Sequence, residues 1–102
     1  MNTTSTITQR ATLPRFPLGK LVATPGALRL LAQHKVEPFD FILRHVGGDY
    51  GAIDAEDVSA NEAAIKRGHR ILSSYPLGSD KRLWIITEAD RSVTTLLLPD
   101  EY

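Results

Sequence analysis

The sequence predicts an α+β domain in which N-terminal helices pack on one face of a mainly antiparallel sheet that ends in a C-terminal β-meander. Two observations lead to this prediction. Residues 82–98 contain two runs rich in Val, Ile, Leu, Thr and Trp on either side of a short polar segment, which is the pattern of a β-hairpin. The residues before about position 70 instead repeat apolar side chains at helical spacing, interrupted by Pro and Gly.

The predicted hairpin lies inside the sheet. Successive side chains of a strand point to opposite faces, and here both faces carry large apolar groups, including Trp84. The connection from Ala89 to Ser92 contains no Gly and suits a four-residue loop built on a type I turn. Pro99 lacks an N–H group and is expected to end the last strand.

Two further strands are predicted. Residues 19–24 form a short strand before the helices, and residues 70–75 form a strand before the hairpin, followed by a loop over residues 76–81. Residues 1–15 are Ser/Thr-rich at their start and interrupted by Pro, so they are expected to form a flexible tail. Residues 16–102 are then a single α+β domain.

The first two of three predicted helices begin at proline. Thr24 is the expected N-cap of a helix that starts at Pro25 and ends near His34, and a second helix runs from Pro38 to the glycines at 47–48. Each helix is expected to turn an apolar stripe to the core. The expected stripes are Leu28, Leu31 and Ala32 in the first helix and Phe39, Ile42, Leu43 and Val46 in the second.

The third predicted helix has two alternative starts. Asp54 is an N-cap candidate with Asp57 three residues later, and both charges suit a helix N-terminus. Ser59 with Glu62 has the spacing of a capping box and gives a later start. In either case Gly68 is the expected C-cap.

Composition excludes several classes of function. The 102 residues include no cysteine, which rules out disulfide scaffolds, thiol catalysis and cysteine-ligated zinc, and fits a cytoplasmic location. Twelve basic and twelve acidic residues cancel, so no overall positive field attracts nucleic acid. We see no secretory signal and no apolar run long enough for a membrane span, so no membrane association is expected.

His45 is the first candidate for chemistry. It lies at the end of the second helix, off the expected apolar stripe, where the helix dipole would favour its charged form. Because histidine titrates near neutral pH, it is also the candidate general acid or base. Nearby carboxylates suggest a hard-cation site as an alternative, but their spacing matches no standard loop, so no metal or other cofactor is expected. These carboxylates are Asp49, Asp54, Asp57 and Glu62.

Arg91, at the hairpin tip, is the second candidate, together with Thr94 and Thr95 in the following strand. A guanidinium group binds phosphate through two parallel hydrogen bonds, and hydroxyl groups add further bonds, so this set suggests a phosphate site. The alternative is a solvated turn in which Glu88 and Asp90 neutralise Arg91.

Two other sets of side chains have both a structural and a functional interpretation. Asn61 lies within a helix, where Asn is not preferred, and is expected to bond the preceding loop. Four aromatic side chains could stack on bases, although in a domain of this size they more often belong to the core or its rim. They are Tyr50, Tyr75, Trp84 and Tyr102.

Three segments carry a resemblance to a known family: FPLGKLVATPGAL, RHVGGDYG and, above all, WIITEADRSVTTLLLPDEY. They resemble a family of small proteobacterial proteins found on plasmids and integrated mobile elements. Many members carry the label "type I restriction endonuclease subunit M". A chain of this length has no room for a methyltransferase domain and has no cofactor-binding Gly loop. The label therefore does not fit this chain. If the chain is an interaction protein carried by a mobile element, the expected partner is a host or mobile-element protein, and RNA is the alternative partner.

The order of elements is also similar to that of compact RNases and RNase toxins of the barnase/colicin type. Those proteins place helices before an antiparallel meander and cleave RNA without metal, using His, Arg and Ser/Thr. This resemblance implies His45 as acid or base, Arg91 as phosphate clamp, and Thr94 or Thr95 as a hydrogen-bond donor to the phosphate. His69 would be the second titrating group.

Two functions are therefore expected from the sequence. The first is a metal-independent RNA-cleaving or RNA-binding protein of toxin type, which uses His45, Arg91, Thr94 and Thr95. The second is a non-enzymatic interaction protein, such as a counter-defence or regulatory factor, that covers the surface of a partner. Clustering of the four residues in one cleft would favour catalysis, whereas an exposed apolar patch would favour a partner surface.

Overall fold

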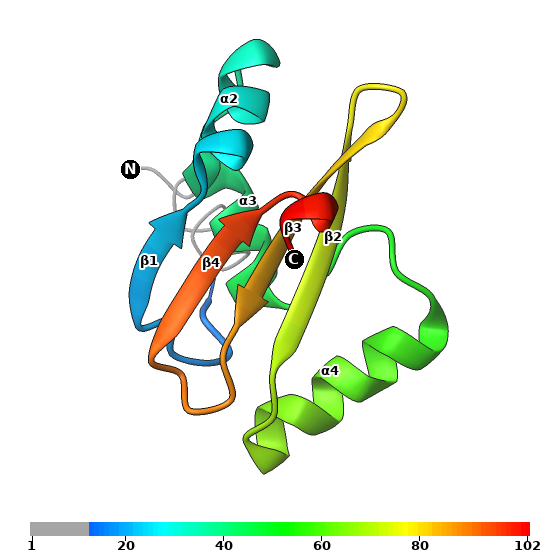
Figure 1. Cartoon of the computed structure of the whole chain (residues 1–102). Helices are drawn as coiled ribbons and strands as arrows, with labels where there is room; N and C mark the ends of the chain where they lie inside the picture. The colour runs from blue at the N-terminus through cyan, green and yellow to red at the C-terminus, as the bar shows by residue number, and fades with distance from the viewer. Residues whose placement is uncertain (1–12) are drawn as a thin grey trace, which may run out of the picture.

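The structure, a computed structural model, describes residues 13–102. It contains a four-stranded sheet, three α-helices and a C-terminal 3₁₀ turn (Figure 1). In chain order the elements are β1 (Lys20–Ala23), α2 (Pro25–Gln33), α3 (Pro38–Gly47), α4 (Ala55–Arg67), β2 (Ile71–Leu77), β3 (Lys81–Thr87), β4 (Val93–Leu97) and η1 (Pro99–Glu101). Within this part of the chain, no helix is both long and apolar enough to cross a membrane.

The sheet has the strand order β1-β4-β3-β2. The last three strands form the predicted antiparallel meander, and β1 adds to β4 in parallel. The predicted α+β fold with a mainly antiparallel sheet is therefore confirmed, and the hairpin strands β3 and β4 are the two internal strands. The internal position explains why both of their faces are apolar.

Helices α2 and α3 cover one face of the sheet, with α3 behind the sheet in the view of Figure 1. The main core forms between them and the inward side chains of the strands. Its largest members are Leu30, Leu31, Phe41, Ile42, Tyr75, Leu83, Ile85 and Leu96. A second cluster brings in α4 and the segment before β1. It consists of Phe16, Val46, Tyr50, Ala64 and Ile71.

The predicted caps are present, and the predicted apolar stripes are right in part: Leu31, Ile42 and Val46 are buried, but Leu28, Ala32, Phe39 and Leu43 are exposed. Thr24 Oγ1 accepts a hydrogen bond from the Ala27 N–H at 3.0 Å, and Gly48 ends α3 in the left-handed conformation. In α3, however, Phe39 is 58% exposed and Leu43 39% exposed. The buried positions are Gly26, Ala27, Leu30 and Leu31 in α2 and Phe41, Ile42, His45 and Val46 in α3.

The difference has a physical cause in α3. Phe41, Ile42 and Val46 share a face with His45. This face packs on the sheet because hydroxyl groups of the strands form hydrogen bonds with the imidazole. A prediction from hydrophobic spacing alone therefore included Phe39 and Leu43, which lie on the neighbouring, exposed face of the helix. In α2, Leu28 and Ala32 were also predicted to be buried but are exposed, because the helix packs Ala27 into the core and Gly26 against Leu98 and Glu101.

Helix α4 starts at the earlier of its two predicted positions. Asp54 Oδ1 accepts from the Asp57 N–H at 2.9 Å, so Asp54 is the N-cap and a start at Ser59 is wrong. Gly68 is the left-handed C-cap, as predicted. The predicted loop over residues 76–81 begins too early, because β2 runs to Leu77. Pro76 is tolerated there because β2 is an edge strand.

Residues 50–61 cover the outer edge of β2. The Ser74 N–H donates to Tyr50 O at 3.0 Å, and the Ala52 N–H donates to Ser74 O at 2.7 Å. Asn61 bonds the backbone of Leu72 in β2, not the preceding loop as predicted. Gly51 lies so close that a Cβ there would be 2.2 Å from Ser74 O, which excludes any side chain.

The predicted tail of residues 1–15 lies mostly outside the described residues. At its end, the Arg15 N–H donates to Val46 O at 2.8 Å, and the Arg15 guanidinium pairs with Glu62 on α4. Phe16 then enters the core beside His45, with the two rings edge to face at 5.3 Å. The segment before β1 is therefore fixed to α3 and α4 from Arg15 onward.

Candidate functional site

His45 is fully buried between α3 and the sheet, with 0% of its surface exposed. Its Nδ1 lies 2.6 Å from Ser73 Oγ on β2, and its Nε2 lies 2.9 Å from Thr87 Oγ1 on β3. Thr87 Oγ1 lies 2.7 Å from Thr94 Oγ1 on β4. The imidazole thus joins α3 to three adjacent strands.

The donor and acceptor of each hydrogen bond in this network follow from the backbone oxygen of Leu18, which can only accept. Thr94 Oγ1 donates to the backbone oxygen of Leu18 at 2.7 Å, so its own oxygen is left to accept from Thr87. Thr87 in turn accepts from His45, which must carry its proton on Nε2. Nδ1 then accepts from the Ser73 hydroxyl. One neutral tautomer satisfies every group in the network.

Burial lowers the pKa of His45 to about 4. The ring is therefore neutral at pH 7, and the expected favourable interaction of a charged ring with the helix dipole does not arise. Both ring nitrogens are bonded within the core, and no ring surface is open to a substrate. The contacts are those of a histidine that holds α3 on the sheet.

Arg91 lies in the hairpin loop with a left-handed backbone, φ 62°. Its guanidinium donates to Ala64 O at 2.9 Å, His69 O at 2.7 Å and Glu88 O at 3.1 Å. The group also lies 5.8 Å from the centre of the Phe16 ring. Both terminal nitrogens thus donate to backbone carbonyls, chiefly at the C-terminal end of α4. The guanidinium is therefore not arranged to bind a phosphate group.

The four predicted site residues are not brought into one cleft. His45 and Thr94 belong to the buried network, whereas Arg91 binds the end of α4. Thr95 points to the opposite face of the sheet from Thr94, because successive side chains alternate. His69, the second titrating candidate, is exposed and contributes only its carbonyl to Arg91.

Two of the four candidate carboxylates are paired with arginine side chains. Asp49 Oδ2 pairs with Arg44 Nε at 2.8 Å, and Glu62 accepts from Arg15 at 2.6 Å and from the Tyr50 hydroxyl at 2.8 Å. The hydrogen bond from Arg15 is the main reason that the pKa of Glu62 falls to about 2. Within residues 13–102, no three His, Cys, Asp or Glu side chains gather as metal ligands would.

The four aromatic candidates divide into two pairs. Tyr50 and Tyr75 are buried, and the Tyr75 hydroxyl donates to Asp49 O at 2.7 Å. Trp84 is half-buried and Tyr102 is 71% exposed, with their rings edge to face at 5.8 Å. Arg70 bonds the Tyr102 hydroxyl and lies 5.9 Å from its ring. This second pair lies on the face of the sheet opposite α2 and α3.

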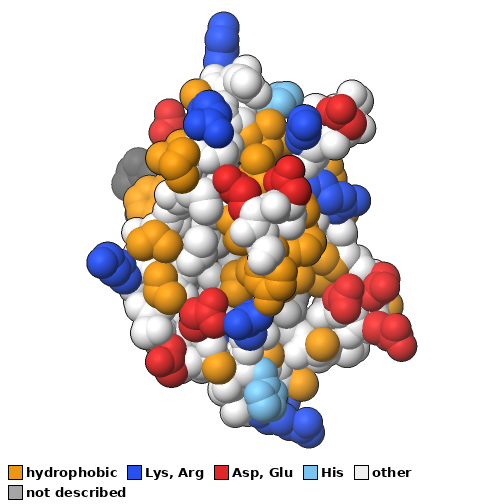
Figure 2. Space-filling view, in the orientation of Figure 1, with side chains coloured by type: hydrophobic (Ala, Val, Ile, Leu, Met, Phe, Trp, Pro, Cys, Tyr) orange, Lys and Arg blue, Asp and Glu red, His pale blue; other side chains and the backbone are white. Residues whose placement is uncertain are grey.

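That second face, here called the open face, carries apolar side chains in register across the strands. Leu72, Ile86, Thr95 and Val22 form one cross-strand row, and Ser74, Trp84 and Leu97 form the next. The turn η1 lies across part of the face (Figure 1), and Ile86 and Leu97 are buried. Figure 2 shows hydrophobic side chains gathered in the middle of the open face, with charges of both signs around them.

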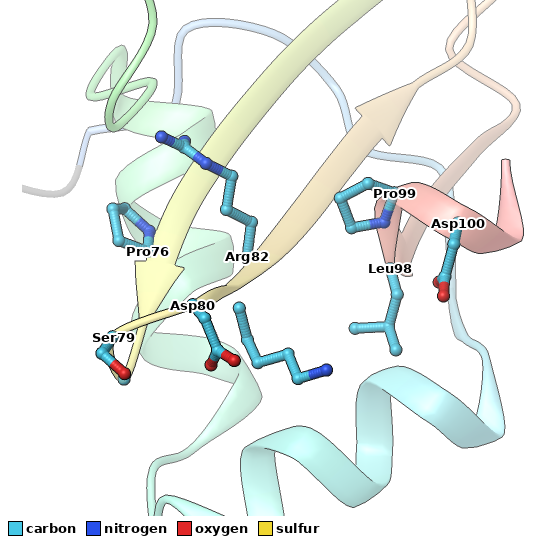
Figure 3. A pocket seen from close by; sticks show the side chains of 9 residues that line it. Pro76, Ser79, Asp80, Arg82, Leu98, Pro99 and Asp100 are labelled. Carbon is cyan, nitrogen blue, oxygen red and sulfur yellow. The ribbon is translucent and has the colours of Figure 1, made fainter.

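A hollow of about 390 Å³ adjoins the open face between the β2–β3 turn and η1. Figure 3 shows Pro76, Ser79, Asp80 and Arg82 on one side and Leu98, Pro99 and Asp100 on the other. A second hollow of about 230 Å³ shares Lys81 and Leu98 with the first and extends to Arg29 on α2. We call the two together the groove. Pro76, Leu98 and Pro99 line it together with charged side chains of both signs.

Comparisons with known proteins add no assignment, since no family model, curated protein or solved structure matches this chain. The candidate site is defined by the geometry alone, and it consists of the open face and the groove.

Sequence reasoning missed the partners of His45. Ser73, Thr87 and Thr94 all occupy inward positions of strands whose other inward residues are apolar. Three hydroxyl groups on the core side, opposite a helix that carries a histidine, are the signal that was available. The groove gave no such signal, because its residues come from a turn, η1 and α2, which are distant in sequence.

Proposed function

We propose that this chain is a non-enzymatic protein-interaction module, which binds a partner polypeptide on the open face and in the adjoining groove. The observation that supports this proposal is the aromatic pair formed by half-buried Trp84 and exposed Tyr102 on the open face. Partly exposed aromatic side chains next to a hollow with a mixed apolar and charged lining are common anchor points of protein interfaces. The burial of His45 argues against the alternative of RNA cleavage.

The charges around the site favour a polypeptide over RNA. Asp80 and Asp100 line the groove together with Lys81 and Arg82, and Arg70 is paired with Glu88 at 3.2 Å. Binding to a nucleic acid backbone depends on a large excess of Lys and Arg, whereas the groove has three basic side chains and two acidic ones. A rim with both signs of charge instead suits apolar side chains flanked by salt-bridging residues.

The resemblance to plasmid and mobile-element proteins suggests where the partner comes from. A host protein or another protein of the element is the expected class, and the chain would then act as a counter-defence or regulatory factor. Binding on a preformed sheet face needs no catalytic group, in agreement with a core histidine that is neutral and fully bonded.

The proposal is tested by placing a photo-crosslinking residue at Ser79 in the groove, with Phe39 as the control site on α3. Phe39 is a suitable control because it is exposed and lies on the covered side of the sheet. A partner crosslinked from Ser79 and not from Phe39 is then purified. Its affinity is measured for the wild type, Tyr102→Ala and Phe39→Ala.

We expect Tyr102→Ala to weaken binding about ten-fold or more and Phe39→Ala to leave it unchanged. Equal losses in the two variants would overturn the proposed surface. The nuclease alternative is tested in parallel by expressing the wild type and His45→Gln and inspecting total RNA. Intact RNA in both is expected, and cleavage by the wild type alone would replace our proposal with catalysis.

A further inference from the structure

The two edge strands of the sheet, β1 and β2, differ in whether their outer backbone groups are covered. Residues 50–61 cover the outer edge of β2, whereas within residues 13–102 no strand or side chain bonds the outer edge of β1. β1 is the outermost strand in Figure 1, and Figure 2 shows hydrophobic side chains along that margin. Leu21 is 42% exposed and Val22 37% exposed. An edge of this kind is a template for a further strand.

The backbone of β1 shows which groups are available at this edge. The N–H groups of Lys20 and Thr24 donate to β4, to Ser92 O and Leu96 O, both at 3.0 Å. Alternate residues of a strand direct their N–H and C=O groups to opposite sides. Lys20, Val22 and Thr24 therefore bond β4, and the N–H and C=O groups of Leu21 and Ala23 point outward.

We propose that a second copy of this chain adds to β1, in an antiparallel pair centred on Val22. Leu21 of each copy then lies opposite Ala23 of the other, and the outward groups of these residues form four backbone hydrogen bonds. The Val22 side chains meet across the two-fold axis, at the closely spaced type of antiparallel pair. The proposal rests on the backbone edge of β1 and does not depend on the proposed partner, although the Val22 side chain also belongs to the open face.

The charges favour a second copy over an unrelated strand. In this register Lys20 of one copy lies opposite Thr24 of the other, and Thr24 holds the carboxylate of Glu101 through a bond of 2.6 Å. Lys20 and Thr24 are each two residues away from Val22 along the chain. Because side chains alternate between the faces, both lie on the open face with Val22. The Lys20 ammonium of each copy therefore approaches the Glu101 carboxylate of the other, and the symmetry makes this pair twice.

The contact is small, since β1 has four residues. A contact of this size belongs to weak, concentration-dependent association rather than to obligate dimers. We therefore expect a monomer in dilute solution and a dimer as the concentration rises.

The test uses the absence of cysteine from the chain. Val22→Cys places two thiols across the axis at a Cα separation that suits a disulfide, whereas Lys35→Cys is an exposed control in the turn after α2, outside β1. Under mild oxidation we expect Val22→Cys to form covalent dimers about ten-fold faster than Lys35→Cys. Equal rates in the two variants would overturn the proposal.

Sedimentation velocity over a concentration series tests the charge pair. Lys20→Glu should abolish the dimer, the double variant Lys20→Glu/Glu101→Lys should restore it, and Lys35→Glu should have no effect. A wild type that stays monomeric at all concentrations, or a dimer insensitive to Lys20→Glu, would refute the proposal. Trp84→Ala should leave self-association intact, which separates this result from failure of the partner-binding surface.

Discussion

The side-chain amide of Asn61 makes the two hydrogen bonds to Leu72 that a neighbouring strand would make. Nδ2 donates to Leu72 O at 2.8 Å, and the Leu72 N–H donates to Oδ1 at 3.1 Å. One residue of α4 thus takes the place of a further strand at the edge of β2. The helical position of an unfavoured residue type is explained by this pairing.

Asn61→Ala should therefore lower the free energy of unfolding by about 1–3 kcal/mol, because it leaves a partly buried N–H and C=O without partners. Urea denaturation measures the change. Ser59→Ala, on the exposed part of the same helix, is the matched control and should change stability by less than about 0.5 kcal/mol. A loss no larger than that of the control would mean that water replaces the amide at no cost.

The burial of His45 predicts a loss of stability in mild acid. Its ordinary pKa is 6.5, and burial lowers the pKa in the folded chain to about 4. Between these values the unfolded chain binds a proton that the folded chain does not, so stability is complete above pH 6.5 and falls as the pH drops to 4. The contribution amounts to about 3 kcal/mol.

The measurement compares urea denaturation of the wild type and His45→Gln at several pH values. The variant should be less stable at pH 7, and its stability should fall less between pH 6.5 and 4. The pKa of Glu62 is lowered from 4.5 to about 2, so most of its effect on stability falls below the pH range of His45. Parallel pH curves for the two proteins would show that His45 is not the titrating group.

Arg91 combines an unfavourable backbone conformation with three useful hydrogen bonds. Arg91→Ala loses the bonds and keeps the left-handed backbone, and we expect a loss of about 2–3 kcal/mol in unfolding free energy. Arg91→Gly loses the same bonds but removes the backbone strain, so it should be more stable than Arg91→Ala by about 1 kcal/mol. Thermal or urea denaturation of both variants gives the order, and the reverse order would contradict the assigned strain.

Trp84 is half-buried on the open face, so Trp84→Ala should cost less than loss of a core tryptophan. We expect about 2 kcal/mol, compared with about 3–5 kcal/mol for full burial. Leu83→Ala, on the same strand and fully buried, provides the comparison. A larger loss for Trp84→Ala than for Leu83→Ala would mean that the open face is itself a core.

The sequence predicted features that depend on neighbouring residues. Thr24, Asp54 and Gly68 were identified as caps because each acts within one turn of its own helix. The hairpin was identified from β-forming residues on both sides of a polar turn. Residue alternation and turn chemistry are local, so these elements could be placed from the chain alone.

Predictions about which face is buried failed where a distant polar group decided the outcome. The exposed face of α3 carries Phe39 and Leu43, and the buried face carries His45, because hydroxyl groups on β2 and β3 bond the imidazole. The same long-range contacts explain the candidate site. His45, Arg91 and Thr94 were predicted to contact a substrate, whereas in the structure they bond protein groups, most of which lie 22 to 76 residues away in sequence.

The β2 edge of the sheet is covered and the β1 edge is exposed, and this difference limits how many copies can assemble through their strands. Gly51, Tyr50 and Asn61 leave no room for a strand beside β2, so strand addition has only one direction open to it. Once two chains have joined through β1, both free edges of the combined sheet are β2 edges. The assembly therefore terminates at two copies, and the protection of one edge is what keeps an exposed apolar strand at the other from leading to fibres.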